Sequence, residues 1–196
     1  ADVGIAMGIT GTEVSKSAAD IILTDDSFST IVRGIQWGRG IYENFQRFIQ
    51  FQLTVNVVAF FIAVLSQILD QDMPFTTIQL LWVNIIMDGP PALALGLEPV
   101  RKSVLKRKPV NRNASIITKN MFITIVCNAL AISGIILMQM VFNVLGAAPE
   151  EAETVLFGLF AFLALFNAFN CREMSKASII PNFLANKIAL KIIGGT

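Results

Sequence analysis

The stretch Gln79-Leu-Leu-Trp-Val-Asn-Ile-Ile-Met-Asp-Gly-Pro-Pro91 decides the fold class of this chain. It lies within an apolar run at about 75–97, which is long enough to cross a bilayer as a helix. Asp88 falls near the middle of this run, one helical turn after Asn84. A carboxylate at that depth costs about 2.5–3.5 kcal/mol on insertion scales, so it is normally kept for an ion, a proton or a partner charge. We therefore expect an ion site inside a membrane helix.

The residues directly after Asp88 are expected to break this helix near 89–91. Gly89 is followed by Pro90 and Pro91, and proline both lacks a backbone N–H and disrupts the helical hydrogen-bond ladder. Carbonyl oxygens are thereby freed at the level of the carboxylate. Carboxylate, amide and carbonyl oxygens together suit a hard cation such as calcium. Two alternatives stay open at this point: the prolines only kink the helix, or Asp88 pairs with a basic side chain.

The composition is that of an integral membrane protein. Hydrophobic residues make up 54% of the chain and charged residues 15%, with a mean hydropathy of +0.65. A soluble domain carries nearer a quarter charged residues. The absence of histidine excludes His-based catalysis and His-ligated zinc within this chain. No basic patch interleaved with aromatic residues is present, so a nucleic-acid partner is not expected.

Four apolar blocks predict four membrane spans, at about 44–68, 75–97, 118–145 and 153–172. Residues 1–40 differ, because short apolar strands alternate there with helical stretches, as at the edge of an α/β domain. So short a segment cannot bury a core alone, and we expect most of that domain upstream of Ala1. Both termini read as cuts through a larger protein. The predicted fold is a mainly α, polytopic membrane helix bundle with a short α/β remnant.

The charged residues of the connections predict the orientation of these spans. Connections 98–118 and 173–196 are basic, whereas the other two hold acids only, at positions 70, 72, 150, 151 and 153. By the positive-inside rule, residues 1–40, the 98–118 loop and the 173–196 tail are cytoplasmic. All 15 Lys and Arg residues then lie on that side. Contact of the basic loop with lipid head groups is a secondary possibility.

Several other polar residues have two possible roles. Asn56 lies near mid-membrane in the first span, and Asn167 and Asn170 lie in the fourth. Each is a candidate ion ligand or a hydrogen-bonding link between helices. Asp25 and Asp26 could bind a metal but are better explained as a helix cap. Likewise, the glycines at positions 4, 8 and 11 are more typical of a tight turn than of a phosphate loop.

Three stretches resemble P-type cation ATPases of the calcium-pump branch. Residues 1–28, from Ala-Asp-Val-Gly-Ile-Ala-Met-Gly to Thr-Asp-Asp-Ser-Phe, resemble the stretch that follows the TGDGxNDAPAL hinge motif. The stretch from Gln79 to Pro91 resembles the sixth membrane helix of these pumps, and Phe166-Asn-Ala-Phe-Asn170 resembles the eighth. The spans would then be helices five to eight of a ten-helix pump. Residues 1–40 would be the C-terminal edge of its HAD-like phosphorylation domain and stalk.

This resemblance implies an ATP-driven calcium pump that forms an aspartyl-phosphate in a cytoplasmic domain. Asn84 and Asp88 match sixth-helix calcium ligands, and Asn56 matches a fifth-helix amide. Ala59 and Ala164 stand where two-calcium pumps have glutamates, and Met87 replaces a threonine ligand. The loss of two carboxylates favours one calcium per cycle.

The sequence combines features of two types of calcium pump. Gln50-Phe-Gln-Leu-Thr-Val-Asn-Val-Val58 is similar to plasma-membrane-type pumps. Met87-Asp-Gly-Pro-Pro91 is closer to secretory-pathway-type pumps, which also move manganese. The resemblance therefore leaves a calcium pump and a manganese/calcium pump open.

The motifs that carry catalysis in this family are expected upstream of Ala1. They are the phosphorylated DKTG motif, the TGDG magnesium motif, the nucleotide domain and the PEGLP-type ligands of the fourth helix. We therefore assign no catalytic and no cofactor-binding residue here, and expect ATP and magnesium to bind only the full-length protein. The chain alone should be inactive. The competing hypothesis is a non-catalytic, truncated membrane helix module, in which polar residues only link helices or line a passive cation pathway.

Overall fold

The computed structural model describes residues 2–111, 113–172 and 191, except for the side chains at positions 86–88 and 102. The described part is mainly helical, with one pair of short strands, which confirms the predicted fold class. Two compact units divide the chain: residues 1–42 with 100–110, and residues 43–99 with 111–196. The predicted 173–196 tail lies outside the described residues, apart from position 191.

The first unit contains a small β-α-β arrangement. Strands β1 (Ile5–Met7) and β2 (Ile21–Leu23) pair in parallel, with Ile5 opposite Ile21, and α1 (Glu13–Ala18) connects them. Thr12 caps α1, because its hydroxyl accepts the N–H of Ser15 at 3.2 Å. Ala6 and Leu23 are the buried apolar side chains of the two strands. The faces of this two-stranded sheet remain largely exposed.

The first unit also contains the 3-10 helix η1 (Lys102–Lys106), which is fixed to helix α2 (Phe28–Ile68). Arg39 of α2 donates to the carbonyl oxygens of Val104 and Arg107, at 2.9 Å each. A Cβ atom at Gly40 would overlap with the side chain of Val100, so this close approach requires glycine. The basic loop is therefore anchored to α2 near its start and at its centre.

Helix α2 runs without interruption through Gly38 and Gly40. Its 41 residues correspond to about 60 Å, or about twice the hydrocarbon thickness of a bilayer. Part of this helix therefore lies outside the membrane. Neither glycine breaks the helix.

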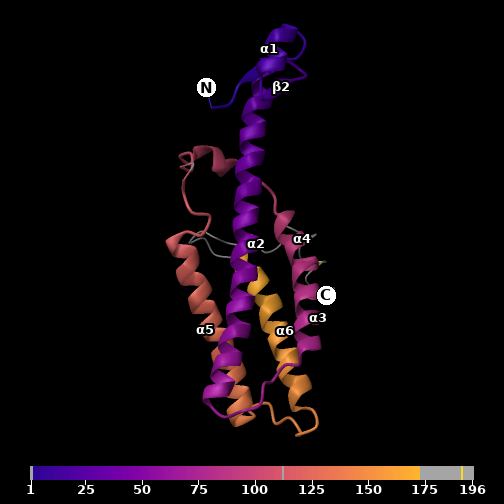
Figure 1. Ribbon diagram of the computed structural model, residues 1–196, viewed down its shortest axis with the longest axis vertical. Helices are drawn as coiled ribbons and strands as arrows, with labels where there is room; N and C mark the ends of the chain where they lie inside the picture. Colours follow the sequence, from indigo (N-terminus) through magenta and orange to yellow (C-terminus); the bar gives the residue numbers. More distant parts are fainter. Residues whose placement is uncertain (1, 112, 173–190, 192–196) are drawn as a thin grey trace. The chain divides into compact units, whose positions relative to one another are not determined.

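The second unit is a bundle of apolar helices. The C-terminal part of α2 is joined by α3 (Thr77–Asp88), α4 (Pro90–Gly96), α5 (Lys119–Phe142) and α6 (Ala152–Cys171). Four segments are long and apolar enough to cross a membrane: Phe28–Ile68, Thr77–Gly96, Lys119–Phe142 and Ala152–Cys171. Helix α6 lies beside α5 and also contacts α3 and α4 (Figure 1). The chain is therefore an integral membrane protein.

The core of this bundle is formed by side chains from every one of its long helices. Fully buried members include Phe51 and Ile62 of α2, Ile136 of α5 and Phe160 of α6. Phe160 also contacts Phe75, with 5.0 Å between ring centroids, which fixes the connection between α2 and α3. Large apolar side chains also face outward on each helix, which is typical of segments surrounded by lipid.

Side-chain caps define where the helices of the bundle begin and end. Thr76 and Gln79 form a reciprocal capping box at the start of α3, and Thr118 caps α5. Helix α5 ends at Phe142 because Asn143 adopts a left-handed conformation with φ of 45°. The side chain of Gln139 then accepts the N–H of Leu145 at 2.8 Å, which stabilises the turn after the helix.

Candidate ion site

The candidate site is built around the junction of α3 and α4. Helix α3 ends at Asp88 and α4 begins at Pro90, with Gly89 between them in a non-helical conformation (φ −80°, ψ −85°). The carbonyls of Ile86 and Met87 cannot receive the usual helical bond four residues on, because positions 90 and 91 are prolines. The backbone therefore offers oxygen atoms next to the predicted carboxylate.

Asp88 is the last residue of α3, and the junction begins with it. Its side chain, like that of Met87, lies outside the described part of the structure, so the predicted ligand is placed here by its backbone alone. Among the described residues there is no group of three or more His, Cys, Asp or Glu side chains that could hold a metal.

The two predicted carboxamide ligands lie on different helices and outside the packed core. Asn84 is exposed on α3, one turn before Asp88, and Asn56 is exposed on α2. Within the described residues, neither carboxamide makes a hydrogen bond. Because lipid offers no hydrogen-bond partner, each amide in a membrane span must be met by an ion, by water or by another polar group. The role of both amides as ion ligands stays a prediction.

Two alanines occupy positions where the resemblance to two-calcium pumps would have glutamates. Ala164 of α6 is 1% exposed and belongs to the core cluster, and Ala59 of α2 packs against the same cluster. The surroundings are apolar side chains, among them Phe160 and Val58. A carboxylate at position 164 would be buried without a charged partner from that cluster, which is costly. This part of the bundle is built for packing.

Asn167 of α6 links its helix to α5. Its side-chain oxygen accepts a hydrogen bond of 3.2 Å from Asn128, and Asn167 is 2% exposed. The side-chain nitrogen of Asn167 is buried without a partner in the described part of the chain. Asn170, three residues later, is exposed. Of the two candidate roles for Asn167, the structure therefore shows the link between helices.

A buried polar cluster at the ends of α4 and α6 is not anticipated by the sequence. Glu98 follows α4 by two residues, and Arg172 is the C-cap residue of α6. The Nε and Nη2 atoms of Arg172 donate to the two carboxylate oxygens of Glu98, at 3.1 Å each. This is a bidentate ion pair, and both residues are almost fully buried. The two lie 74 positions apart, so no local pattern reveals them.

Helix α2 contributes to the same cluster through Asn44. Its side-chain nitrogen donates to the carbonyl oxygens of Gly96 and Glu98, at 2.9 and 3.0 Å. Arg47 in turn donates to the side-chain oxygen of Asn44, and its Nη2 atom lies 3.5 Å from Oε2 of Glu43. Residues from α2, α4 and α6 thus meet at one end of the bundle. The only sequence signal is a set of charges at the edges of predicted spans.

The two aspartates of the first unit have structural roles. Asp25 accepts hydrogen bonds from the Thr30 hydroxyl at 2.5 Å and from the Ser27 N–H at 3.1 Å, which connect it to the residues at the start of α2. The bond from Thr30, followed by that from Ser27, lowers the pKa of Asp25 below 3.8. Asp26 instead accepts the N–H groups of Ile9 and Thr10, at 2.9 and 2.7 Å. The bond from Ile9 is the main cause of a lowered pKa for Asp26.

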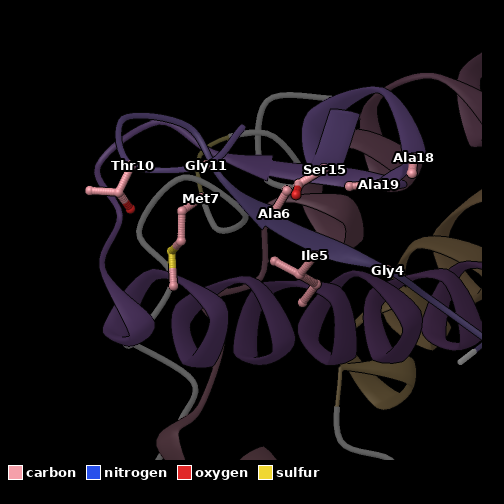
Figure 2. Close-up of a pocket in the computed structure, with 9 residues that line it drawn as sticks. All are labelled: Gly4, Ile5, Ala6, Met7, Thr10, Gly11, Ser15, Ala18 and Ala19. Carbon is pink, nitrogen blue, oxygen red and sulfur yellow. The ribbon is translucent and has the colours of Figure 1, made fainter. Parts of the chain in front are cut away.

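The glycines between β1 and α1 form a tight turn. A Cβ at Gly8 would lie 2.6 Å from the carbonyl oxygen of Leu23, and one at Gly11 would overlap with the carbonyl of Met7. The open pocket shown in Figure 2 is lined by this turn, β1 and α1. Because Asp26 already occupies the N–H groups of the turn, they are not directed at a phosphate. The turn is therefore structural.

Comparison with known protein families identifies the chain. The model of the family described as "Cation transporting ATPase, C-terminus" matches residues 72–196, which is more than half of the chain. The chain belongs to this family. The matched region includes Asn84, Asp88, Glu98 and Arg172, whereas Asn56 precedes it. The family assignment made from the motifs is confirmed.

Curated relatives match over the whole chain. It is 42% identical to "Probable calcium-transporting ATPase 8, plasma membrane-type" of Oryza sativa subsp. japonica, of which it covers 20%. It is 42% identical to "Plasma membrane calcium-transporting ATPase 2" of Oreochromis mossambicus and 41% identical to "Plasma membrane calcium-transporting ATPase 3" of Homo sapiens, covering 19% and 17% of these proteins. The chain thus spans about a fifth of the length of the relatives it matches.

Proposed function

We propose that this chain is the membrane portion of an ATP-driven calcium pump and supplies ligands of a transmembrane calcium site. Asp88 contributes the carboxylate, Asn84 an amide from the preceding turn, and Asn56 an amide from α2. The observation that carries the proposal is the interrupted helix, which leaves Asp88 at the junction of α3 and α4 beside carbonyls that cannot accept the usual helical hydrogen bond. The calcium-transporting relatives support calcium as the ion.

The remainder of the pump supplies what this chain lacks. The N-terminal portion of the same protein binds ATP and magnesium and carries the phosphorylated aspartate. Residues 1–40, the 98–118 loop and the C-terminus are cytoplasmic, because the basic residues gather there. The continuous helix α2 passes from the first unit into the membrane bundle, and carries movement of the phosphorylation domain to the ion site.

We further infer that one calcium ion is moved in each cycle. The alanines at positions 59 and 164 pack into the apolar core, where a second set of carboxylates would be needed for a second divalent ion. Asn167, which lies one turn after Ala164, is engaged with Asn128. The pattern supports a single site at the α3–α4 junction. Manganese is a second candidate ion, on the strength of the Met87-Asp-Gly-Pro-Pro91 string.

The decisive experiment is Asp88→Asn in the full-length pump that contains this chain. Phosphorylation of the enzyme by ATP is measured as free calcium is varied, and then as free manganese is varied. Loss of metal-dependent phosphorylation with a folded, membrane-inserted protein supports the proposal. The matched control is Asp72→Asn, which makes the same change at an exposed position between α2 and α3 and should leave the calcium dependence unchanged.

The same experiment distinguishes the competing hypothesis. If Asp88 only links helices, its replacement changes thermal stability but not the calcium concentration needed for phosphorylation. That result would show that the calcium site is not at this junction. Phosphorylation of the isolated chain by ATP would contradict the assignment of ATP binding and phosphorylation to the N-terminal portion of the pump.

A further inference from the structure

The buried ion pair between Glu98 and Arg172 joins the end of α4 to the end of α6. Glu98 is 5% and Arg172 is 3% exposed, and both carboxylate oxygens are engaged by the guanidinium at 3.1 Å. A bidentate pair of this kind fixes orientation as well as distance, because the planar guanidinium matches the carboxylate edge. The pair therefore holds the backbone at Glu98 in one place relative to α6.

Such a pair is a poor way to gain stability alone. Removing two charges from water costs much of what their attraction returns, and well-packed apolar residues often serve as well or better. In some proteins a buried pair of this kind instead serves to fix one geometry. The cluster at Glu98 therefore calls for a role in positioning.

A second, independent contact holds the same segment from the other side. Asn44 of α2 donates to the carbonyls of Gly96 and Glu98. The carbonyl of Gly96 belongs to the last turn of α4 and has no helical N–H partner, so Asn44 acts as a cap from a neighbouring helix. Arg47 orients Asn44 by donating to its side-chain oxygen. The end of α4 is thereby fixed to both α2 and α6.

Helix α4 is a short, rigid connection between this fixed end and the ion site. It has seven residues, or about 10 Å, and begins one residue after Gly89. Three of its residues, Pro91, Ala94 and Leu95, are buried, and the helix packs against α6 and α3. Because close-packed segments move as units, a shift at Glu98 is transmitted to the α3–α4 junction. Asp88 lies at that junction.

We propose that Glu98 and Arg172 are positioning residues for the calcium site, a role that rests on the function proposed above. They do not touch the ion. They hold the end of α4 so that Asp88, Gly89 and the adjacent carbonyls stay in the geometry that binds the ion. Residues that orient metal ligands typically change metal affinity by about 10–100-fold when replaced. We expect an effect near the lower end, because the pair acts through a whole helix.

Three variants of the full-length pump test this inference. Glu98→Gln removes the charge and keeps the shape, Arg172→Lys keeps the charge and loses the bidentate geometry, and the double variant Glu98→Met with Arg172→Met replaces the pair by apolar packing. Phosphorylation by ATP is measured against free calcium, together with thermal unfolding. The expected result is a rise of about tenfold in the half-saturating calcium concentration for Glu98→Gln and the double variant, and a smaller rise for Arg172→Lys. The maximal phosphoenzyme level at saturating calcium should stay the same.

The shift in half-saturation at constant maximum is the readout that a merely structural role would not produce. Arg172→Lys should recover part of the affinity lost in the double variant, because the attraction across the pair remains. The control is Glu13→Gln, which breaks an exposed ion pair with Lys16 by the same chemical change and should leave half-saturation unaltered. Half-saturation equal to that of the unmodified pump in both Glu98→Gln and the double variant would overturn the inference.

Two further outcomes have defined meanings. A reduced phosphoenzyme level without a shift in half-saturation, or loss of folded protein in all three variants, would assign the pair to folding alone and overturn the inference. Asp88→Asn is measured in parallel. If Asp88→Asn keeps its calcium dependence, the proposed calcium site is wrong. If Asp88→Asn loses its calcium dependence while the Glu98 and Arg172 variants bind calcium normally, only the positioning role is wrong.

Discussion

Two groups of polar side chains in the membrane bundle differ in how completely they are satisfied. At the ends of α4 and α6, Glu98 and Arg172 engage each other fully, and Asn44 uses its amide on two carbonyls. In the spans, Asn56 and Asn84 are exposed and make no hydrogen bond within the described residues. Groups that are satisfied internally can hold a structure, whereas groups without partners are free to bind a ligand. The difference separates the scaffold from the candidate site.

The largest expected effect comes from breaking the satisfied group on one side only. Arg172→Met leaves the carboxylate of Glu98 buried without its guanidinium, and loss of one partner of a buried pair costs about 3–5 kcal/mol. Thermal or denaturant unfolding of the detergent-solubilised protein would show this as a marked loss of stability. The double replacement by methionine should restore most of it. If Arg172→Met were as stable as the unmodified protein, the ion pair would not be buried as the structure indicates.

Replacing the carboxylate of the candidate site should have the opposite character. Asp88→Asn is expected to leave the unfolding of the calcium-free protein nearly unchanged, because the proposed role of Asp88 is to bind the ion and not to link helices. Calcium at about 100 times its dissociation constant should stabilise the unmodified full-length protein by about 2.7 kcal/mol. The variant should lose that increment. If calcium stabilised both proteins equally, the ion would be bound elsewhere.

The sequence predicts the scaffold well because it is built from repeated apolar blocks. Each of the four spans is set by composition, and the two short strands are set by Val3–Met7 and Ile21–Leu23 together with the glycine turn. Depth along a span follows from residue spacing, but the direction in which a side chain faces does not. Asn56 and Asn167 look equivalent in the sequence, yet one is exposed and the other is 2% exposed.

The polar cluster could not be predicted for a related reason. Glu98 and Arg172 lie next to span ends, where charged residues are expected to face the interface and to set topology. Their pairing depends on how α4 and α6 pack, which is a tertiary contact between residues far apart in the sequence. The predicted ligands stay a prediction at Asp88, whose side chain lies outside the described part of the structure.

Asn167 lies between the two groups and gives a smaller effect. One of its polar atoms is engaged by Asn128, while its side-chain nitrogen has no partner in the described residues. Interhelical hydrogen bonds in membranes contribute about 0.6 kcal/mol on average, so Asn128→Ala should destabilise the bundle by about that amount. Unfolding in detergent is a suitable measurement. Reduced calcium affinity in Asn128→Ala would mean that Asn167 belongs to the ion site as well.

The smallest effect is expected at Asp25. Its carboxylate accepts hydrogen bonds at an exposed position, whereas both groups compared above lie in the membrane bundle. Hydrogen bonds from Thr30 and Ser27 lower its pKa below 3.8, so folding favours the charged form. A lowered folded-state pKa contributes stability that is present above the unfolded pKa and lost as the pH falls through the folded value. Asp25→Asn should therefore lose a small stabilisation at neutral pH, and its unfolding should be less sensitive to pH in the range below about 4. Unfolding midpoints measured from pH 7 downward test this, with Asp20→Asn as the control because Asp20 serves β1 rather than the start of α2. An equal pH dependence in Asp25→Asn and the unmodified protein would show that these hydrogen bonds do not depend on the charge.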